Sequence, residues 1–109
     1  MKGFVYLILQ ADIHGEETYK IGITKNDPQK RLRQLKTGNP NSLSVLKAYQ
    51  SEHYLKIERW LHRKYFSCKT IAQNEWRTLT DEQVASFMSD CKHADDNLTW
   101  LSKRNPFFD

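Results

Sequence analysis

Phe4-Val5-Tyr6-Leu7-Ile8-Leu9 carries apolar, β-branched or aromatic side chains on both alternating sides, which is typical of a central strand covered on both faces. A second strand is predicted at Tyr19-Lys20-Ile21-Gly22-Ile23-Thr24. The polar residues 11–18 between them predict a loop or hairpin connection. The chain therefore begins with two strands that pair.

The second strand has two chemically different sides. Alternation places Tyr19, Ile21 and Ile23 on one side and Lys20, Gly22 and Thr24 on the other. Gly22 leaves a space on its side of the strand, where a ligand or another backbone can come close. If the two strands are antiparallel, Tyr6 and Lys20 can share this face.

A helix follows the second strand. Its boundaries are marked by an N-cap, a proline at the first helical position and two helix breakers after Lys36, namely Asp27, Pro28, Gly38 and Pro40. Leu32 and Leu35 supply its buried side, and Arg31 flanks that apolar stripe.

The remainder predicts one more strand and two more helices. Residues 43–49 form the strand, and Ser51 caps a helix that runs to about residue 66. The apolar face of this helix is Tyr54, Ile57, Leu61 and Tyr65. Residues 75–79 are short and extended. A capping box of Thr80 and Gln83 opens a third helix, whose inward residues are Val84, Phe87, Met88 and Cys91.

Beyond His93 there are two alternatives: a further helix turn around Trp100, or docking of Phe107 and Phe108 on the body of the protein. The order of elements predicts an α+β fold, a small three-stranded antiparallel sheet flanked by helices with a helical C-terminal end. At 109 residues we expect one domain, residues 1–109.

The charge is unevenly distributed around a formal net value of +4. One basic group comprises Lys25, Lys30, Arg31, Arg33 and Lys36, and a second comprises Lys56, Arg59, Arg63, Lys64 and Lys69. Residues 81–96 are acidic, with Asp81, Glu82, Asp90, Asp95 and Asp96. This polarity suits a polyanion bound on one side, although solvated helix faces explain it as well.

The compartment is inferred from weak signals. Cys68 and Cys91 are two widely spaced cysteines, which indicates free thiols in a reducing compartment. No apolar run is long enough to cross a bilayer and no secretory signal is visible. We therefore expect a cytoplasmic protein without a membrane partner.

Glu58 is the most unusual residue, because it lies in the same helical stripe as Tyr54, Leu61 and Tyr65. An unpaired charge removed from water is costly, so this carboxylate needs a cation. Two alternatives stay open: an ion pair with Arg31 or Lys20 that closes the core, or a bound metal ion.

Two further residues could take part in chemistry near Glu58. A neighbouring Lys20 ammonium would favour the phenolate form of Tyr6, so that Tyr6 could accept a proton from water. A strand tyrosine read alone is more ordinarily a core residue. His62 lies four residues after Glu58, and is either a metal ligand or an ordinary, partly exposed helix histidine.

In these motifs the chain resembles the GIY-YIG nuclease superfamily, in particular its short phage and bacterial branch with a K-I-G second signature. The matching segments are Val5-Tyr6-Leu7, Tyr19-Lys20-Ile21-Gly22-Ile23-Thr24, Arg31-Leu32 with Leu35-Lys-Thr-Gly-Asn-Pro40, Glu58-Arg-Trp-Leu61-His62, and Glu75-Trp76. The resemblance covers residues 3–88 and leaves residues 89–109 as a C-terminal extension. It implies a three-stranded antiparallel sheet flanked by helices.

The resemblance also implies roles. Tyr6 matches the tyrosine that activates water, Arg31 the arginine that holds the scissile phosphate, and Glu58 the glutamate that binds one divalent metal, Mg²⁺ or Mn²⁺. Lys20 stands where the family has its second tyrosine, and Tyr19 lies one position earlier. The late asparagine of the family has Asn74 or Glu75 as its nearest candidate; with Tyr19 and His62, these are the expected supporting residues.

The resulting hypothesis is a metal-dependent endonuclease that hydrolyses phosphodiester bonds in nucleic acid, DNA before RNA, with Tyr6, Lys20, Arg31 and Glu58 at its centre. The alternative is a catalytically inactive nucleic-acid-binding module of the same fold. The expected nucleic-acid contacts are Lys25, Lys30, Arg33, Lys36, Arg59 and Arg63. A homodimer or a recruiting protein partner is compatible with the absence of any second recognition motif.

Overall fold

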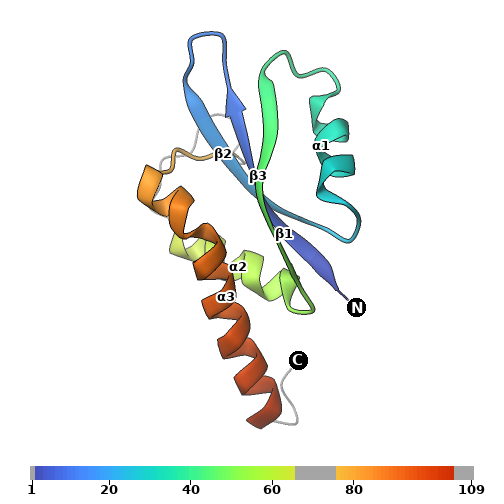
Figure 1. Cartoon of the computed structure of the whole chain (residues 1–109), viewed down its shortest axis with the longest axis vertical. Helices are drawn as coiled ribbons and strands as arrows, with labels where there is room; N and C mark the ends of the chain where they lie inside the picture. The colour runs from blue at the N-terminus through green and yellow to red at the C-terminus, as the bar shows by residue number, and fades with distance from the viewer. Residues whose placement is uncertain (1, 66–75, 105–109) are drawn as a thin grey trace.

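The computed structural model describes residues 2–65 and 76–104. A three-stranded antiparallel sheet forms its centre, with β1 (Gly3–Ala11) between β2 (Glu17–Thr24) and β3 (Ser42–Ser51) (Figure 1). β1 is the central strand because nearly all its side chains are apolar and both its faces are covered. The predicted α+β class and sheet are confirmed.

The register of β1 on β2 brings Tyr6 and Lys20 to one face. Tyr6 pairs with Gly22 and Ile8 pairs with Lys20, so the two side chains are diagonal neighbours. The expectation that they share a face is confirmed.

Helices cover both faces of this sheet. On one face α1 (Pro28–Lys36) packs against Tyr6 and Ile8 through Leu32. On the other, α2 (Tyr54–Lys64) and α3 (Asp81–Arg104) form the larger core with the opposite side of β1. β2 lies at one edge of the sheet.

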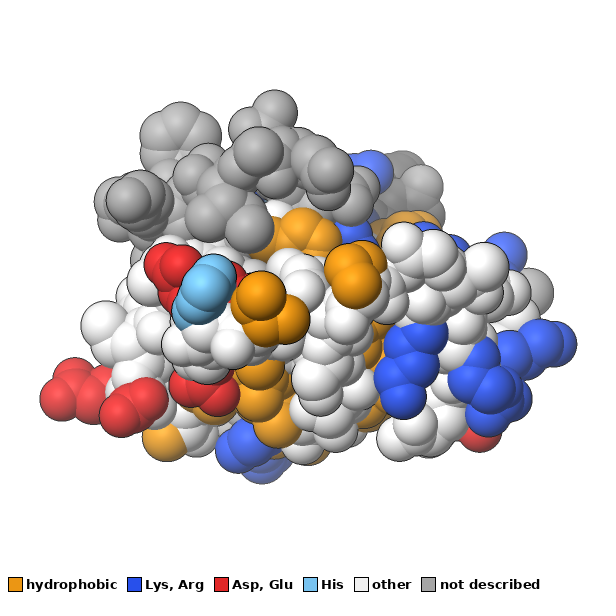
Figure 2. All heavy atoms as spheres, turned by 90° about the horizontal axis from the view of Figure 1, so that it is seen from above, with side chains coloured by type: hydrophobic (Ala, Val, Ile, Leu, Met, Phe, Trp, Pro, Cys, Tyr) orange, Lys and Arg blue, Asp and Glu red, His pale blue; other side chains and the backbone are white. Residues whose placement is uncertain are grey.

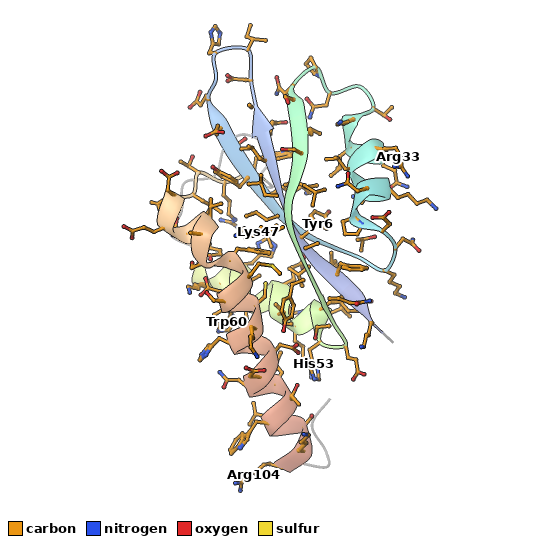
Figure 3. The ribbon with its side chains drawn as sticks, in the orientation of Figure 1. Tyr6, Arg33, Lys47, His53, Trp60 and Arg104 are labelled. Carbon is orange, nitrogen blue, oxygen red and sulfur yellow. The ribbon has the colours of Figure 1, made fainter. Side chains whose placement is uncertain are left out.

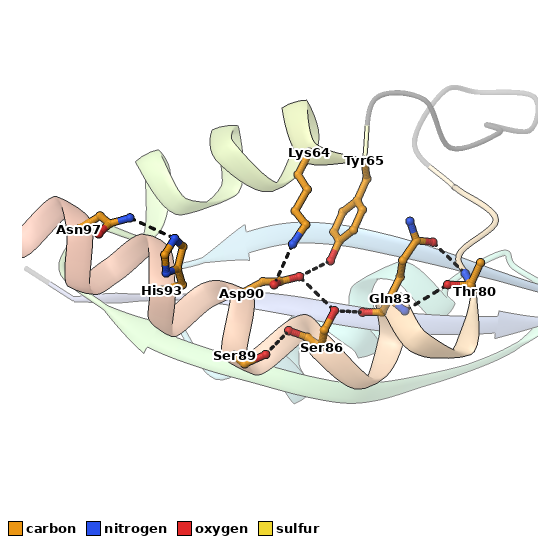
Figure 4. Close-up of polar contacts among 9 residues, drawn as sticks. All are labelled: Lys64, Tyr65, Thr80, Gln83, Ser86, Ser89, Asp90, His93 and Asn97. Atoms are coloured by element: carbon orange, nitrogen blue, oxygen red, sulfur yellow. Dashed lines mark hydrogen bonds and ion pairs between the residues drawn. The ribbon is translucent and has the colours of Figure 1, made fainter.

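The predicted N-terminal caps are confirmed for two of the three helices, α1 and α3. Asp27 caps α1 by accepting the Gln29 N–H at 3.0 Å. Thr80 and Gln83 form the predicted capping box, with reciprocal bonds of 2.8 and 3.1 Å (Figure 4).

Ser51 does not cap the second helix as predicted, because it is still the last residue of β3 and the helix begins at Tyr54. Its hydroxyl accepts the His53 N–H at 2.9 Å and donates to Asp95 at 2.7 Å.

α3 is one continuous helix of 24 residues that runs through Trp100 to Arg104 and projects beyond the sheet (Figure 1). Of the two alternatives for this region, the helical one is confirmed. Met88 was predicted to face inward, but it is exposed, because it follows the fully buried Phe87 by a rotation of about 100° around the helix.

Two acids of the predicted acidic surface instead attach α3 to the body. Asp90 pairs with Lys64 at 2.8 Å and accepts the Tyr65 hydroxyl at 2.8 Å (Figure 4). Asp95 accepts the hydroxyls of Tyr49 and Ser51.

Several residues singled out in the sequence lie outside the described residues, namely Cys68, Lys69, Asn74, Glu75, Phe107 and Phe108. Cys91 is a free, buried thiol. No described helix has the length and hydropathy that a membrane span requires.

Candidate active site

A pocket of about 280 Å³ lies at the β2 edge of the sheet. Its lining comes from β1, β2, α1 and α2 and consists of Tyr6, Lys20, Ile21, Gly22, Ile23, Arg31, Glu58 and His62. Four elements far apart in the sequence thus bring together all four residues that were predicted to be catalytic.

The pocket opens along the strand edge. Four consecutive residues of β2, Lys20 to Ile23, line it, although alternate side chains in a strand point to opposite faces. Earlier in the strand the edge is covered, because the backbone of Tyr19 exchanges two hydrogen bonds of 2.8 Å with Arg77. The open part of the edge therefore lies beside Gly22, where α1 and α2 supply the walls.

Tyr6 lines the pocket and is almost fully buried. Only 2% of the residue is exposed, and it packs in the smaller core with Ile8 and Leu32. A Cβ built on Gly22 would collide with the phenol hydroxyl and would lie 2.5 Å from Cζ. The space that Gly22 leaves is thus filled by the Tyr6 phenol, and glycine at this position lets the hydroxyl reach the pocket.

Lys20 is buried on the same face, with 8% of the residue exposed. Lys20 also lines the pocket and supplies a cationic side chain to it.

Glu58 lies at the border of the α2 apolar face, and its side chain is 23% exposed. Its Oε2 lies 3.8 Å from Nε2 of His62, one helical turn later. Arg31 instead donates from Nη1 to Oε1 of Gln34 at 3.1 Å. An Arg31–Glu58 ion pair, one of the alternatives considered for Glu58, is not formed between these two described residues, although both line the same pocket.

Gln34 was missed by sequence reasoning. It lies three residues after Arg31, a spacing that brings side chains together on a helix, and this was the available signal.

The donor set limits what metal could be held here. The described residues contain no cluster of three or more His, Cys, Asp or Glu side chains suited to a metal. One half-buried carboxylate with a neighbouring histidine fits a hard cation such as Mg²⁺, which keeps several waters and takes the rest of its ligands from a phosphate. It does not fit a closed structural zinc site.

The predicted nucleic-acid contacts divide into two sets. Lys25, Lys30, Arg33 and Lys36 are exposed on α1 and the residues before it. Arg33 extends outward from α1 in Figure 3, and Figure 2 shows basic side chains gathered at one end of the view and acidic ones at the other. Arg59 and Arg63 do not line the pocket; they border a separate groove between α2 and α3.

Tyr19 lies in the larger core on the opposite face of the sheet, with α2 and α3. Burial, followed by the charges of Glu17 and Asp81, raises the pKa of its phenol. It is not among the residues lining the pocket. Asn74 and Glu75, the other predicted supporting residues, lie outside the described residues.

Comparisons with known proteins identify a domain family for the chain. No curated protein and no solved structure is significantly similar to the chain. The T5orf172 domain, which occurs in phage and bacterial nuclease-like proteins, matches residues 3–92 and thus nearly all of the sheet, α1 and α2. The chain belongs to the T5orf172 domain family.

Proposed function

We propose that this protein is a metal-dependent endonuclease of the GIY-YIG type that hydrolyses phosphodiester bonds in DNA. One observation carries the proposal: Tyr6, Lys20, Arg31 and Glu58 come from four different elements and line one open pocket. Packing alone does not require two cations, a phenol and a carboxylate to meet at a sheet edge. Membership of a family found in nuclease-like proteins supports the same reading.

In this proposal each side chain has one task. The deprotonated phenol oxygen of Tyr6 accepts a proton from the attacking water, whose oxygen bonds to phosphorus as the bond to the leaving oxygen breaks, and the leaving oxygen takes up a proton from solvent. Lys20 stabilises the negative charge on the phenol oxygen. Arg31 donates hydrogen bonds to the non-bridging phosphate oxygens, and these bonds strengthen as charge develops in the transition state.

Glu58 would hold a divalent cation, Mg²⁺ or Mn²⁺, with His62 beside it. Such a cation, when bound, stabilises charge on the leaving oxygen. The small number of protein ligands implies weak binding in the free protein and tighter binding once a phosphate completes the coordination.

The DNA backbone would approach from the α1 side. Lys25, Lys30, Arg33 and Lys36 surround Arg31 on and before this helix and are exposed, as phosphate contacts require. Arg59 and Arg63 face another groove, so the proposal does not include them in this surface.

Nicking of supercoiled plasmid with and without Mg²⁺ tests the proposal. We expect nicking by the wild type that EDTA abolishes, and none by Glu58→Gln. If the protein shows no metal-dependent nicking of plasmid, single-stranded DNA or RNA but still binds DNA, it is instead the inactive binding module. The described residues contain no preassembled metal cluster, which is compatible with this alternative.

A further inference from the structure

A second hollow of about 370 Å³ lies between α2 and α3, away from the pocket. We call it the α2–α3 groove. Its lining contains both cations and apolar side chains. We call the cationic lining residues Lys56, Arg59 and Arg63 its rim, and the apolar lining residues Trp60, Leu98 and Leu101 its floor.

We propose that the α2–α3 groove docks an acidic amphipathic helix of another protein. The proposal is independent of the nuclease chemistry, because none of these six residues lines the pocket. It concerns a partner that recruits the domain rather than a substrate.

Charge and shape favour such an occupant. Arg59 and Arg63 are exposed and four residues apart, so they project along one side of α2. Leu98 and Leu101 present apolar surface from α3, and 41% of Leu101 is exposed. An apolar floor bordered by a row of cations complements a helix whose apolar stripe is bordered by acids, as in helix-in-groove recognition.

The length of the groove agrees with this. Its α3 lining begins at Ala94 and ends at Leu101. Seven residues of helix rise by about 10 Å, which is two turns of a docked helix.

Nucleic acid suits the groove less well. Among the described residues Trp60 is the only aromatic one that lines it, whereas sites for single strands combine a basic groove with several aromatic faces on which bases stack. The Trp60 ring already has the Lys64 ammonium 5.3 Å from its centre and the centre of the His93 ring 6.2 Å away. The remaining floor is aliphatic and offers no stacking surface.

The test uses the full chain and a fluorescein-labelled helical peptide of about four turns. The peptide carries leucine at positions i, i+3, i+4 and i+7, with glutamates on both flanks of the stripe. Its control has lysine in place of each glutamate. Binding is followed by fluorescence anisotropy. We expect saturable binding of the acidic peptide only.

Charge reversal gives the sharper comparison. Arg59→Glu with Arg63→Glu should weaken acidic-peptide binding by roughly tenfold or more and create binding of the lysine peptide. Arg33→Glu with Lys36→Glu on α1 changes the net charge equally and should leave peptide affinity within about twofold. Leu101→Asp, at an exposed floor position, should also abolish binding while far-UV circular dichroism and plasmid nicking stay unchanged.

Three outcomes would overturn the proposal. One is equal binding of both peptides, or of neither. Another is loss of single-stranded DNA binding in the Arg59/Arg63 reversal without loss of peptide binding, which would make the groove a nucleic-acid surface. The third is a wild-type dimer in light scattering that Leu101→Asp converts to a monomer, since the occupant would then be a second copy of the chain.

Discussion

The phenol of Tyr6 occupies the space that a side chain at residue 22 would fill, so the Tyr6 hydroxyl and Gly22 form one structural unit. The two residues are paired across β1 and β2, which fixes their relationship through the backbone. Any substitution at residue 22 must therefore act first on the position of the phenol.

Gly22→Ala should reduce cleavage by about 100-fold, because a methyl group 2.5 Å from Cζ must displace the ring and a misplacement of roughly 1 Å costs about that much. The overpacking should also cost about 1–3 kcal/mol of unfolding free energy. Plasmid nicking and urea denaturation measure the two effects.

Gly15→Ala is the matched control for this variant. Gly15 has φ +79°, and a Cβ there meets no atom within 4 Å. It should lose about 1–2 kcal/mol through backbone strain yet keep its activity. Equal loss of activity in both variants would mean that Gly22→Ala acts through stability alone.

Tyr6→Phe should lower the cleavage rate by about 10²–10⁴-fold, since it removes the proposed proton acceptor and little volume. Tyr19→Phe is the control, because its ring packs on the opposite face of the sheet. Lys20→Met should give an intermediate loss. If Tyr19→Phe were the inactive variant and Tyr6→Phe active, the proposed role of Tyr6 would be wrong.

Glu58→Gln should abolish nicking and weaken Mn²⁺ binding measured by electron paramagnetic resonance, while DNA binding is kept or improved. Its unfolding free energy should stay within about 1 kcal/mol of wild type, because the pair with His62 is long and partly exposed. A large loss of stability with unchanged Mn²⁺ binding would instead identify a structural ion pair.

Arg31→Ala should lower turnover far more than it lowers DNA affinity, since a contact that strengthens in the transition state acts on the rate. Arg33→Ala, two residues away on the exposed side of α1, should reduce affinity and its salt dependence with little effect on single-turnover rate. The same ratio of rate loss to affinity loss in both variants would leave Arg31 without a specific role.

The sheet, and the side of β2 on which each residue lies, were predictable because strand periodicity is two and leaves few choices. Alternation put Lys20 on the side opposite Tyr19, Ile21 and Ile23, and the observed antiparallel register brings it diagonally next to Tyr6. The partial burial of Glu58 followed in the same manner from its place in the α2 stripe.

What could not be predicted depends on contacts between distant segments. Glu58 and Arg59 are adjacent in sequence, but a rotation of about 100° per residue turns them toward different hollows. The second hollow forms where α3 packs beside α2, and the position of α3 cannot be inferred from the sequence of α2. The role of Asp90 was missed for the same reason, because its partners lie on α2 and just after it.

Asp90 and Tyr65 tie the stability of the fold to pH at both ends of the scale. Burial alone would raise the pKa of Asp90, but hydrogen bonds from Lys64 and Tyr65 outweigh it and hold the pKa below the ordinary 3.8. Burial, reinforced by the hydrogen bond to Asp90, raises the pKa of Tyr65 above the ordinary 10.0.

The two pKa shifts predict that the unfolding free energy falls both at low pH, the acid limb, and at high pH, the alkaline limb. The lowered pKa of Asp90 stabilises the fold above about pH 3.8, and this contribution is lost as the pH falls through the folded value. The raised pKa of Tyr65 contributes stability below pH 10.0. This stability is lost as the pH rises above 10.0, because Tyr65 ionises in the unfolded chain before it ionises in the folded protein. Asp90→Asn should cost about 1–3 kcal/mol near neutral pH and flatten the acid limb. Tyr65→Phe should reduce the alkaline limb and, because it removes one of the hydrogen bonds to Asp90, should also shorten the acid limb in part. Urea denaturation across a pH series measures both limbs, with Tyr49→Phe as the control, since Tyr49 bonds Asp95 instead and should leave the acid limb of Asp90 intact. An acid limb unchanged in Asp90→Asn would show that this network does not govern the acid stability of the fold.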